Sequence, residues 1–221
     1  MIYLIVKRFF DFVFSLTILL TLSPFLILIS IILIMTGEHA VFYFQTRIGH
    51  RNVPFAIWKF ATMIRNSAKI GTKTITVPGD CRVLPFGRFL RFTKINELPQ
   101  LVNILLGQMS FVGPRPMVKR GWEKYPDEFR NVIYNVKPGL TGIGSVVFRN
   151  EAELVAKLGG DPREVYINII FPHKGKLELW YQENISFITD LKIIFLTAWV
   201  ILFPKSKIYK KWFKTLPEII L

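Results

Sequence analysis

The sequence predicts a mostly helical α+β protein with an apolar segment near its N-terminus and a small basic body. Three observations support this class. No charged residue occurs from Phe12 to Gly37, the rest of the chain reads as short helical stretches with one hairpin, and Lys and Arg (29) outnumber Asp and Glu (15). At 221 residues, of which 51% are apolar, the chain fits one domain with an attachment and is too hydrophobic to be disordered.

The net charge of +14 requires an anionic partner, and the usual choices are nucleic acid, an anionic membrane surface or a phosphorylated ligand. A long apolar segment argues against a soluble nucleic-acid-binding module, so no nucleic-acid partner is expected. A single cysteine, Cys81, excludes an internal disulfide, and with only three histidines it makes a closed structural zinc site improbable.

The N-terminal segment is predicted to enter a membrane, because it is long enough to cross about 30 Å of hydrocarbon as a helix. Ser23 and Pro24 lie at its centre, and a proline inside a helix removes one hydrogen bond and clashes with the carbonyl of Leu20, so a kink is expected there. Positive charge flanks both ends, at Lys7, Arg8, Arg47, Arg51 and Lys59.

Charge on both sides favours placing both ends of the segment on the cytoplasmic face. A re-entrant helix-break-helix, which enters and leaves by one leaflet, satisfies this preference. The alternative is a straight single span that tolerates its proline. We therefore divide the chain into a membrane anchor (1–37), a cytosolic domain (38–190) and C-terminal interfacial helices (191–221).

The body is predicted element by element from its turn residues. Val41–Trp58 alternates aromatic and polar residues around Gly49 and Pro54, which is typical of a hairpin, and 69–82 is expected to be a loop. Helices are expected over Phe89–Leu106 with an interruption at Pro99, over Val118–Val136 with a break at Pro126, over Glu151–Leu158 up to Gly159, and from Asp161-Pro162 onward.

The C-terminal stretch is apolar over Ile193–Phe203 and is ended by Pro204. Lysines interleaved with aromatic residues follow. Such a segment suits an anionic bilayer surface, and it equally suits an amphipathic helix packed on the protein with a solvated lysine face.

The stretch 87–116 is dense in residues that bind phosphate. If it were helical, Arg91, Lys94 and Glu97 would recur on one face. Cations around one carboxylate fit a diphosphate with its magnesium ion, although an ordinary surface helix with ion pairs has the same composition.

The chain resembles a known family through motifs in order along most of its length: KRFFD at 7, SP at 23, FYFQTRIG at 42, WKFATM at 58, GRFLR at 87, NELPQL at 96, GQMSFVGPRP at 107, KPGLTG at 137 and YQENISFITDLK at 181. It is similar to the bacterial sugar transferases, the monotopic phosphoglycosyl transferases. The resemblance implies an enzyme that transfers a sugar phosphate from a nucleoside diphosphate sugar, usually UDP-linked, to polyprenyl phosphate with release of UMP, as the first membrane step of glycan assembly.

The resemblance further implies a re-entrant anchor and a small catalytic domain on the cytoplasmic face of the bacterial inner membrane, with Mg²⁺ as cofactor and membrane lipids as partners. A homodimer is left open. Carried over motif by motif, it assigns catalysis and metal binding to positions 96 and 97, and substrate binding to Lys59, Arg88, Arg115 and Arg149.

One departure concerns the chemistry directly. The family has an Asp-Glu pair in which the Asp forms a covalent phosphosugar intermediate, whereas this chain has Asn96-Glu97. A neutral amide is a poor nucleophile and a weaker Mg²⁺ ligand than a carboxylate. Three hypotheses remain: direct attack by polyprenyl phosphate, a disabled nucleophile, or a catalytically silent relative that acts as a membrane-bound scaffold.

Smaller departures are an Ala61 where the family motif has an arginine, and Ser145 in place of a common glutamine. We expect an altered donor preference from them. Asp80 is considered as a second acidic ligand, with a loop-capping role as the alternative.

Overall fold

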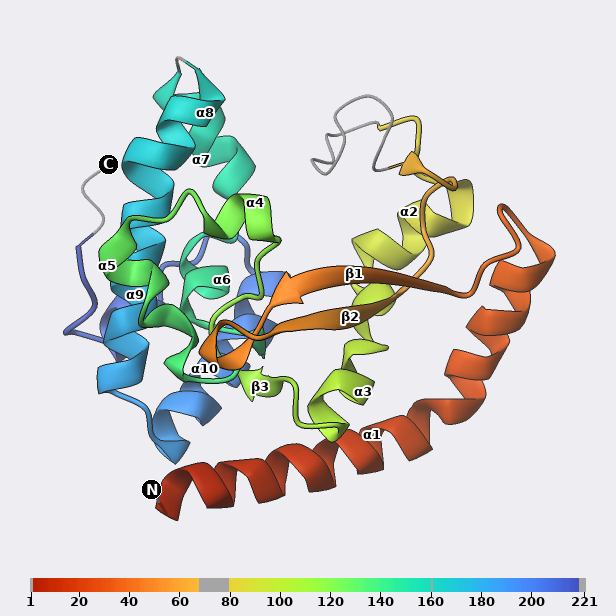
Figure 1. The fold of residues 1–221 in the computed structure, drawn as a ribbon, viewed down its shortest axis with the longest axis horizontal. Coiled ribbons are helices and arrows are strands. Elements are labelled where there is room, and N and C mark those ends of the chain that lie inside the picture. Colours follow the sequence, from red (N-terminus) through yellow and green to blue (C-terminus); the bar gives the residue numbers. More distant parts are fainter. Residues whose placement is uncertain (1, 68–79, 160, 219–221) are drawn as a thin grey trace. The chain divides into compact units, whose positions relative to one another are not determined.

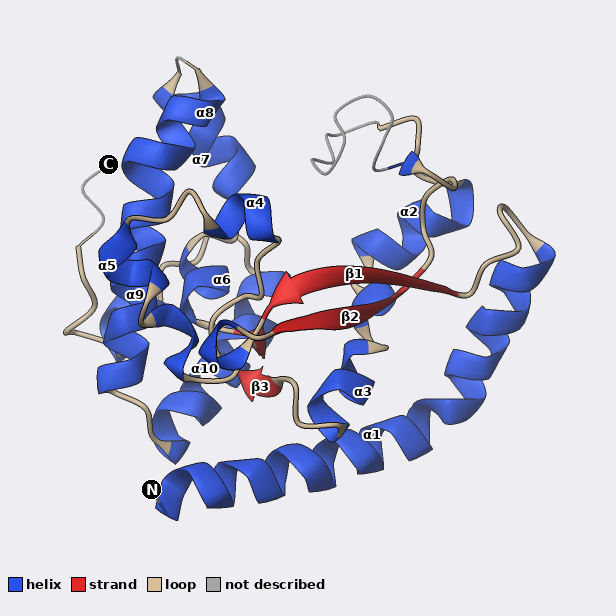
Figure 2. Ribbon diagram, in the orientation of Figure 1, coloured by secondary structure: helices blue, strands red, loops and turns tan. Residues whose placement is uncertain are grey.

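The computed structural model describes residues 2–67, 80–159 and 161–218, and its helices and strands are shown in Figures 1 and 2. The chain forms two compact units. Unit 1 contains Met1–Asp11, Thr46–Phe55 and Gly107–Leu221, and unit 2 contains Phe12–Gln45 and Ala56–Leu106. Most of the predicted loop 69–82 lies outside the described residues. The three-part division by membrane attachment stays a prediction.

The first element, α1 (Ile2–Met35), is one continuous helix with Pro24 inside it. By length and composition, Tyr3–Met35 is able to cross a membrane. Pro24 has no N–H for the Leu20 carbonyl, and the Ser23 hydroxyl donates to that carbonyl instead, at 2.8 Å. The helix changes direction partway along its length (Figure 1). The predicted kink is therefore present as a bend, and the helix is not divided in two as the helix-break-helix prediction required.

The predicted hairpin is confirmed. Strands β1 (Phe42–Ile48) and β2 (Pro54–Phe60) form a two-stranded sheet joined by the short turn η1 (His50–Asn52). Aromatic rings cover it: Phe42 stacks on Phe60 at 5.7 Å between centroids, and Trp58 meets Phe44 edge-on at 4.8 Å.

Unit 2 continues with α2 (Pro85–Phe92), η3 (Ile95–Glu97) and α3 (Gln100–Leu105). The prediction that the chain is helical from Phe89 up to Pro99, and with it the shared face of Arg91, Lys94 and Glu97, is wrong. Lys94 adopts a left-handed conformation with φ of 62°, which ends α2 and turns the chain into η3. The expected interruption at Pro99 is present, because α3 begins directly after it.

Packing in unit 2 centres on buried side chains from three elements: Ile29 and Leu33 of α1, Phe60 of β2 and Leu90 of α2. Each is 3% exposed or less. Burial of this kind contributes about 1.5–3 kcal/mol per side chain, which fixes the second half of α1 against β2 and α2.

Unit 1 contains a small parallel sheet of β3 (Ser110–Val112) and β4 (Gly139–Thr141), in which Ser110 pairs with Gly139. The segment between them was expected to be helical with a break at Pro126. It forms three short turns: α4 (Lys119–Trp122), α5 (Asp127–Arg130) and η4 (Ile133–Asn135).

The part of unit 1 that follows β4 is mostly helical, and several predicted ends are confirmed. It comprises α6 (Ile143–Val147), α7 (Glu151–Leu158), α8 (Pro162–Val165), the π-helical turn η5 (Tyr166–Ile170), α9 (Phe171–Glu183), α10 (Phe187–Leu202) and α11 (Tyr209–Trp212). Helix α7 has the predicted bounds, and Gly159 ends it with φ of 68°.

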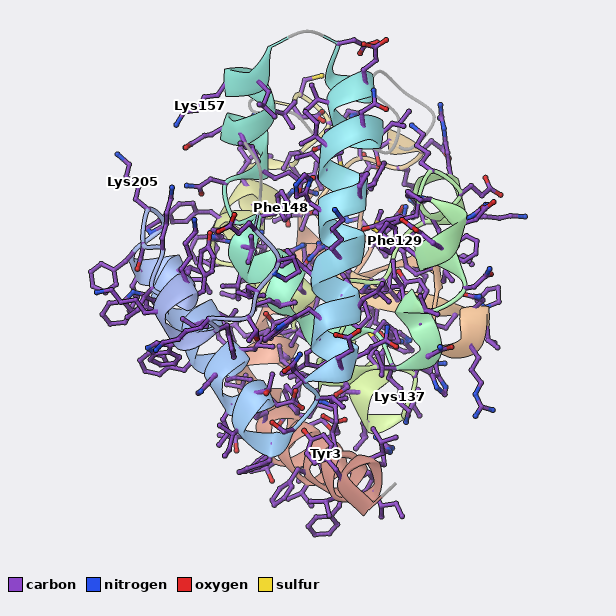
Figure 3. All side chains as sticks on the ribbon, turned by 90° about the vertical axis from the view of Figure 1, so that its left-hand side faces the viewer. Tyr3, Phe129, Lys137, Phe148, Lys157 and Lys205 are labelled. Carbon is purple, nitrogen blue, oxygen red and sulfur yellow. The ribbon has the colours of Figure 1, made fainter. Side chains whose placement is uncertain are left out.

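Helix α10 packs one face into the main core of unit 1, where Ile193 and Leu196 are fully buried. Tyr209 and Phe213 are buried in the same core, while Lys210, Lys211 and Lys214 are exposed. For residues 209–214 the structure thus favours the second interpretation, an amphipathic segment packed on the protein. Lys205, before this segment, points away from the body of the unit (Figure 3).

A polar cluster fastens the start of α1 to α10 within unit 1. The Asp190 carboxylate accepts hydrogen bonds from the hydroxyls of Tyr3 and Tyr181, each at 2.6 Å, and pairs with Lys7. Figure 3 labels Tyr3 beside the base of this unit. The buried Asp190 charge is thereby compensated by one ammonium and two hydroxyl donors.

Candidate functional site

Lys59 and Glu97, both predicted from the sequence, are brought together in unit 2. Lys59 lies near the end of β2 and Glu97 ends η3, and Lys59 Nζ is 2.7 Å from Glu97 Oε1. Their side chains are 15% and 17% exposed, so the pair is only partly reached by water. A lysine and a carboxylate this close supply one positive and one negative group at a partly buried position, and these are group types that bind phosphate and metal ions.

The strand that carries Lys59 is held by Asn103, which is fully buried on α3. The side-chain Oδ1 of Asn103 accepts a hydrogen bond from the backbone N–H of Trp58 at 2.9 Å, and its Nδ2 donates to the backbone carbonyl of Ala56 at 2.8 Å. One side chain thus makes the two hydrogen bonds that a neighbouring strand would make. Asn103 lies in the polar stretch 87–116, but sequence reasoning assigned it no role, because its partners lie far away along the chain.

Asn96, at the predicted catalytic position, is buried at 7% exposure. Its Oδ1 has no hydrogen-bond partner among the described residues. Buried polar atoms are nearly always paired, so an unpaired oxygen calls for an explanation. Because carboxylate and amide oxygens are ligands of Mg²⁺, Asn96 and Glu97 fit an ion that takes its other ligands from phosphate and water.

Within the described part of the chain, no group of three or more His, Cys, Asp or Glu side chains is placed to hold a metal. Asp80, considered as a further ligand, is engaged elsewhere. Its carboxylate accepts Arg82 Nε at 2.9 Å and the Arg82 backbone N–H at 3.0 Å. This supports the loop-capping interpretation of Asp80.

Arg88 lies exposed on α2, in the same unit as Lys59 and Glu97. Arg115 and Arg149 belong to unit 1, and both are exposed. Arg149 follows Phe148, a buried residue at the end of α6, and precedes α7.

Arg115 stands in a segment that the KPGLTG motif supports from one side. The backbones of Gly113 and Gly139 approach so closely that a Cβ on Gly139 would lie 2.2 Å from the Gly113 nitrogen. A Cβ on Gly113 would lie equally close to the Lys137 carbonyl, at 2.2 Å. Only glycine permits this contact, which explains the glycine in each motif.

Glu178 on α9 is a buried acid that the sequence did not indicate. It is 5% exposed, and its Oε2 has no hydrogen-bond partner among the described residues. Burial raises the pKa of Glu178 to about 8, against the lowering effects of the Lys174 charge and of a hydrogen bond from the Gly144 backbone. A carboxyl so placed is largely protonated at neutral pH.

These features describe a basic protein with a helix long and apolar enough to cross a membrane, a paired Lys and Glu, and a buried amide oxygen on the residue before that Glu. The chain belongs to the bacterial sugar transferase family, whose profile matches residues 2–204. The predicted membership, and with it the expectation of a transferase, is confirmed.

Similar curated proteins include two large enzymes. A UDP-glucose:undecaprenyl-phosphate glucose-1-phosphate transferase of Klebsiella pneumoniae is 35% identical over 88% of this chain and 40% of its own length. An undecaprenyl-phosphate galactose phosphotransferase of Salmonella typhimurium is 32% identical over 89% of this chain and also 40% of its own length. The chain therefore spans less than half of these relatives.

A relative of similar size is an uncharacterized sugar transferase of Bacillus subtilis, which is 33% identical over 88% of this chain and 86% of its own length.

Proposed function

We propose that the protein transfers a sugar phosphate from a UDP-sugar to polyprenyl phosphate at a membrane surface and releases UMP. The observation that carries the proposal is the Lys59–Glu97 pair at 2.7 Å, with the buried Oδ1 of Asn96 on the residue that precedes Glu97. The names of the relatives, which join UDP-glucose or galactose to undecaprenyl phosphate, give the reaction class.

In this proposal the pyrophosphate bond is broken by direct attack. An oxygen of polyprenyl phosphate bonds to the phosphorus that carries the sugar, and the bond from that phosphorus to the bridging oxygen breaks. The bridging oxygen leaves as part of UMP. The sugar phosphate is then joined to the polyprenyl phosphate, and the product is a polyprenyl diphosphate that carries the sugar. Asn96 takes no covalent part, because its amide nitrogen and oxygen are poor nucleophiles.

The residues of the chain supply charge and position. Lys59 neutralises phosphate oxygens, and Arg88, Arg115 and Arg149 are proposed as further phosphate contacts, since arginine binds phosphate in a bidentate manner. Glu97 and Asn96 are proposed to hold Mg²⁺, which when bound neutralises the charge that develops on the leaving phosphate. Catalysis then rests on orientation and charge neutralisation.

For topology we propose a monotopic attachment on the cytoplasmic face of the bacterial inner membrane, with α1 entering and leaving by one leaflet. Support comes from positive charge at both ends of the apolar segment, from Pro24, and from the bend of α1 (Figure 1). The outward face of α10 is proposed as a further lipid contact. Whether a second copy of the chain takes part is left to measurement of the oligomeric state.

The experiment combines a panel of UDP-sugars with intact-mass analysis. The purified protein and its Asn96→Asp variant are incubated with each donor, Mg²⁺ and undecaprenyl phosphate. Release of UMP by the Asn form without a phosphosugar adduct is the expected result. An adduct on the Asp variant, with activity in that variant alone, would instead identify Asn96 as a disabled nucleophile.

A second candidate function is favoured by Asn96 itself: a catalytically silent relative that binds lipid phosphate or partner enzymes as a scaffold. It predicts binding of UDP without UMP release in either form of the protein. The same experiment separates the two functions.

A further inference from the structure

Every backbone carbonyl of the segment 114–117, which carries Arg115, accepts a hydrogen bond. Four consecutive backbone oxygens, those of residues 114–117, each accept a hydrogen bond: in order, from the Gly139 N–H at 2.9 Å, the Tyr134 hydroxyl at 2.9 Å, Arg47 Nη1 at 3.2 Å and the Ile48 N–H at 2.8 Å. All of these residues belong to unit 1. Connecting segments usually leave such groups to water, so this segment is unusually constrained.

Tyr134 makes two of the hydrogen bonds of this segment with one atom. Its hydroxyl donates to the Arg115 carbonyl at 2.9 Å and accepts the Met117 N–H at 2.9 Å. It therefore spans Pro116 and closes the turn. The side chain is 2% exposed and packs in a cluster that includes Tyr125 and Phe129, so the hydroxyl is carried on a fixed ring.

Arg115 is the exposed member of its segment. Pro114 and Pro116 on either side are buried, and their rings fix φ at both positions. The backbone on each side of Arg115 is therefore set by the prolines, and its carbonyl by Tyr134. A guanidinium on such a backbone loses less freedom when it binds an anion than one on a free loop, and this increases affinity.

We infer that Tyr134 is a positioning residue, which holds the Arg115 backbone so that its guanidinium meets a phosphate of the nucleotide donor. The inference rests on the proposed function, in which Arg115 is a phosphate contact. Tyr134 itself does not touch the substrate. It acts through the turn, and its effect on nucleotide binding depends on the Arg115 guanidinium.

The test measures the dissociation constant of UDP with Mg²⁺ by calorimetry on the full chain in detergent, which needs no turnover. Four proteins are compared with the natural chain: Tyr134→Phe, Arg115→Ala, the double variant, and Tyr125→Phe. The last is a matched control, since Tyr125 is buried in the same cluster and its hydroxyl makes no hydrogen bond that the structure shows among the described residues.

The expected result is a loss of affinity that the two residues share. Tyr134→Phe weakens UDP binding about fivefold to tenfold, because two buried backbone groups lose their partner and the turn loosens. Arg115→Ala weakens it at least as much, and the double variant binds no more weakly than Arg115→Ala alone. The dissociation constant of UDP for Tyr125→Phe stays within about twofold of that for the natural chain, because this substitution removes no hydrogen bond of the turn.

Two results overturn the inference, and they are distinguishable. If Arg115→Ala weakens binding while Tyr134→Phe does not, or if the two losses multiply in the double variant, Tyr134 does not act through Arg115 and the proposed function stands. If Arg115→Ala binds UDP as the natural chain does, the placement of Arg115 in the proposed site falls, and the role of Tyr134 falls with it.

A variant at the same position covers the case in which Tyr134→Phe does not fold. Replacement of Tyr134 by 4-aminophenylalanine keeps a donor and an acceptor at the place of the hydroxyl. UDP binding within about twofold of the natural chain supports the positioning role. A tenfold loss in this folded variant contradicts it.

Discussion

The Lys59–Glu97 pair sits where solvent reaches each side chain only partly, at 15% and 17% exposure. Charges in such a place are costly to leave without their partner. The pair is therefore part of the stability of unit 2 as well as of its proposed chemistry, and the two contributions are measurable separately.

Lys59→Met and Glu97→Gln are expected to lower the free energy of unfolding by about 1–3 kcal/mol each, because each leaves a partly buried charge unpaired. The double variant should lose less than the sum of the two. Chemical denaturation of the four proteins in detergent measures this coupling. Additive losses would show that the contact contributes nothing in solution.

Glu178 makes stability depend on pH. Its folded pKa of about 8 lies above the ordinary value of 4.5, so the folded state holds a proton that the unfolded state has released between these values. The contribution of this proton to the free energy of unfolding is fully present below pH 4.5 and is lost as the pH rises to about 8. Above that pH, Glu178 is ionised in both states and stability no longer changes with its titration.

The variant Glu178→Gln should remove this dependence and raise stability at pH 8 relative to the natural chain by on the order of 4 kcal/mol. Melting temperatures from pH 5 to 9 measure it. Glu183→Gln, on the exposed end of α9, is the control and should keep the natural pH profile. Parallel profiles for Glu178→Gln and the natural chain would show that Glu178 titrates normally.

At the scale of elements, β2 depends on a helix for the hydrogen bonds that a third strand would make. Asn103 of α3 takes that place at Ala56 and Trp58. The arrangement links the position of Lys59, one residue further along the strand, to α3 and so to the segment that carries Glu97.

Asn103→Asp is expected to cost about 2–4 kcal/mol of stability, because a carboxylate cannot donate to the Ala56 carbonyl and because a charge is costly to bury. Asn131→Asp, the same change at an exposed position, should cost less than about 0.5 kcal/mol. Denaturant unfolding of both variants makes the comparison. Equal losses would mean that the two hydrogen bonds of Asn103 are not formed.

Helix α10 is apolar on its outward face as well as on its buried one. The exposed apolar residues include Ile188 at 65% and Leu202 at 72%, together with Phe187, Leu191, Ile194, Phe195 and Ile201. A helix that is hydrophobic all round is normally covered on every side. In the proposed function, membrane lipid covers this outward face of α10.

A single cysteine at residue 194 tests this, in a chain whose natural cysteine is replaced by Cys81→Ser. An environment-sensitive fluorophore on Ile194→Cys should shift its emission to shorter wavelength on vesicles that contain phosphatidylglycerol, and lipid-borne quenchers should reach it. The same label on Lys176→Cys, at an exposed position of α9, should remain in water. Equal quenching of both labels by aqueous iodide would rule out the lipid contact.

At the scale of the whole molecule, the proposal depends on which side of the membrane each part occupies. Positive charge at both ends of the apolar segment and the bend of α1 support a re-entrant anchor (Figure 1). The proposed reaction takes its nucleotide donor from the cytoplasm, so it requires the body to lie on that side.

Leu4→Cys and Arg120→Cys, each in the Cys81→Ser chain, place a thiol before and after the apolar segment at exposed positions. Both should react with a membrane-impermeant maleimide only in inside-out vesicles. Opposite sidedness of the two thiols would establish a straight span and remove the access of the body to UDP-sugars.

Local signals predicted those elements whose ends are set by residues close in sequence. Gly159 ends α7 at the expected place, and Pro204 follows the end of α10. Ser23 and Pro24 indicated the bend of α1. The break after Phe92 was missed, because Lys94 carries no turn signal and adopts its positive φ only in the folded context.

The candidate site divides in the same way. The motifs located Lys59, Glu97 and Arg115, since each stands in a short segment with its own composition. The roles of Asn103, Tyr134 and Glu178 were not predicted, because each depends on a partner from another element. Asn103 bonds Ala56, Tyr134 bonds Arg115, and Glu178 accepts from the Gly144 backbone. No spacing rule along the chain describes such contacts.

The amino-acid order by itself determined the long apolar N-terminal segment, the basic charge, the family and the segments from which a phosphate site would be built, because composition and short motifs are properties of neighbouring residues. The tertiary structure alone decided that Lys59 meets Glu97, that Asn96 Oδ1 is buried with no hydrogen-bond partner among the described residues, and that the Arg115 turn is held by Tyr134. These depend on burial and on hydrogen bonds between distant segments, and both arise only when the chain packs.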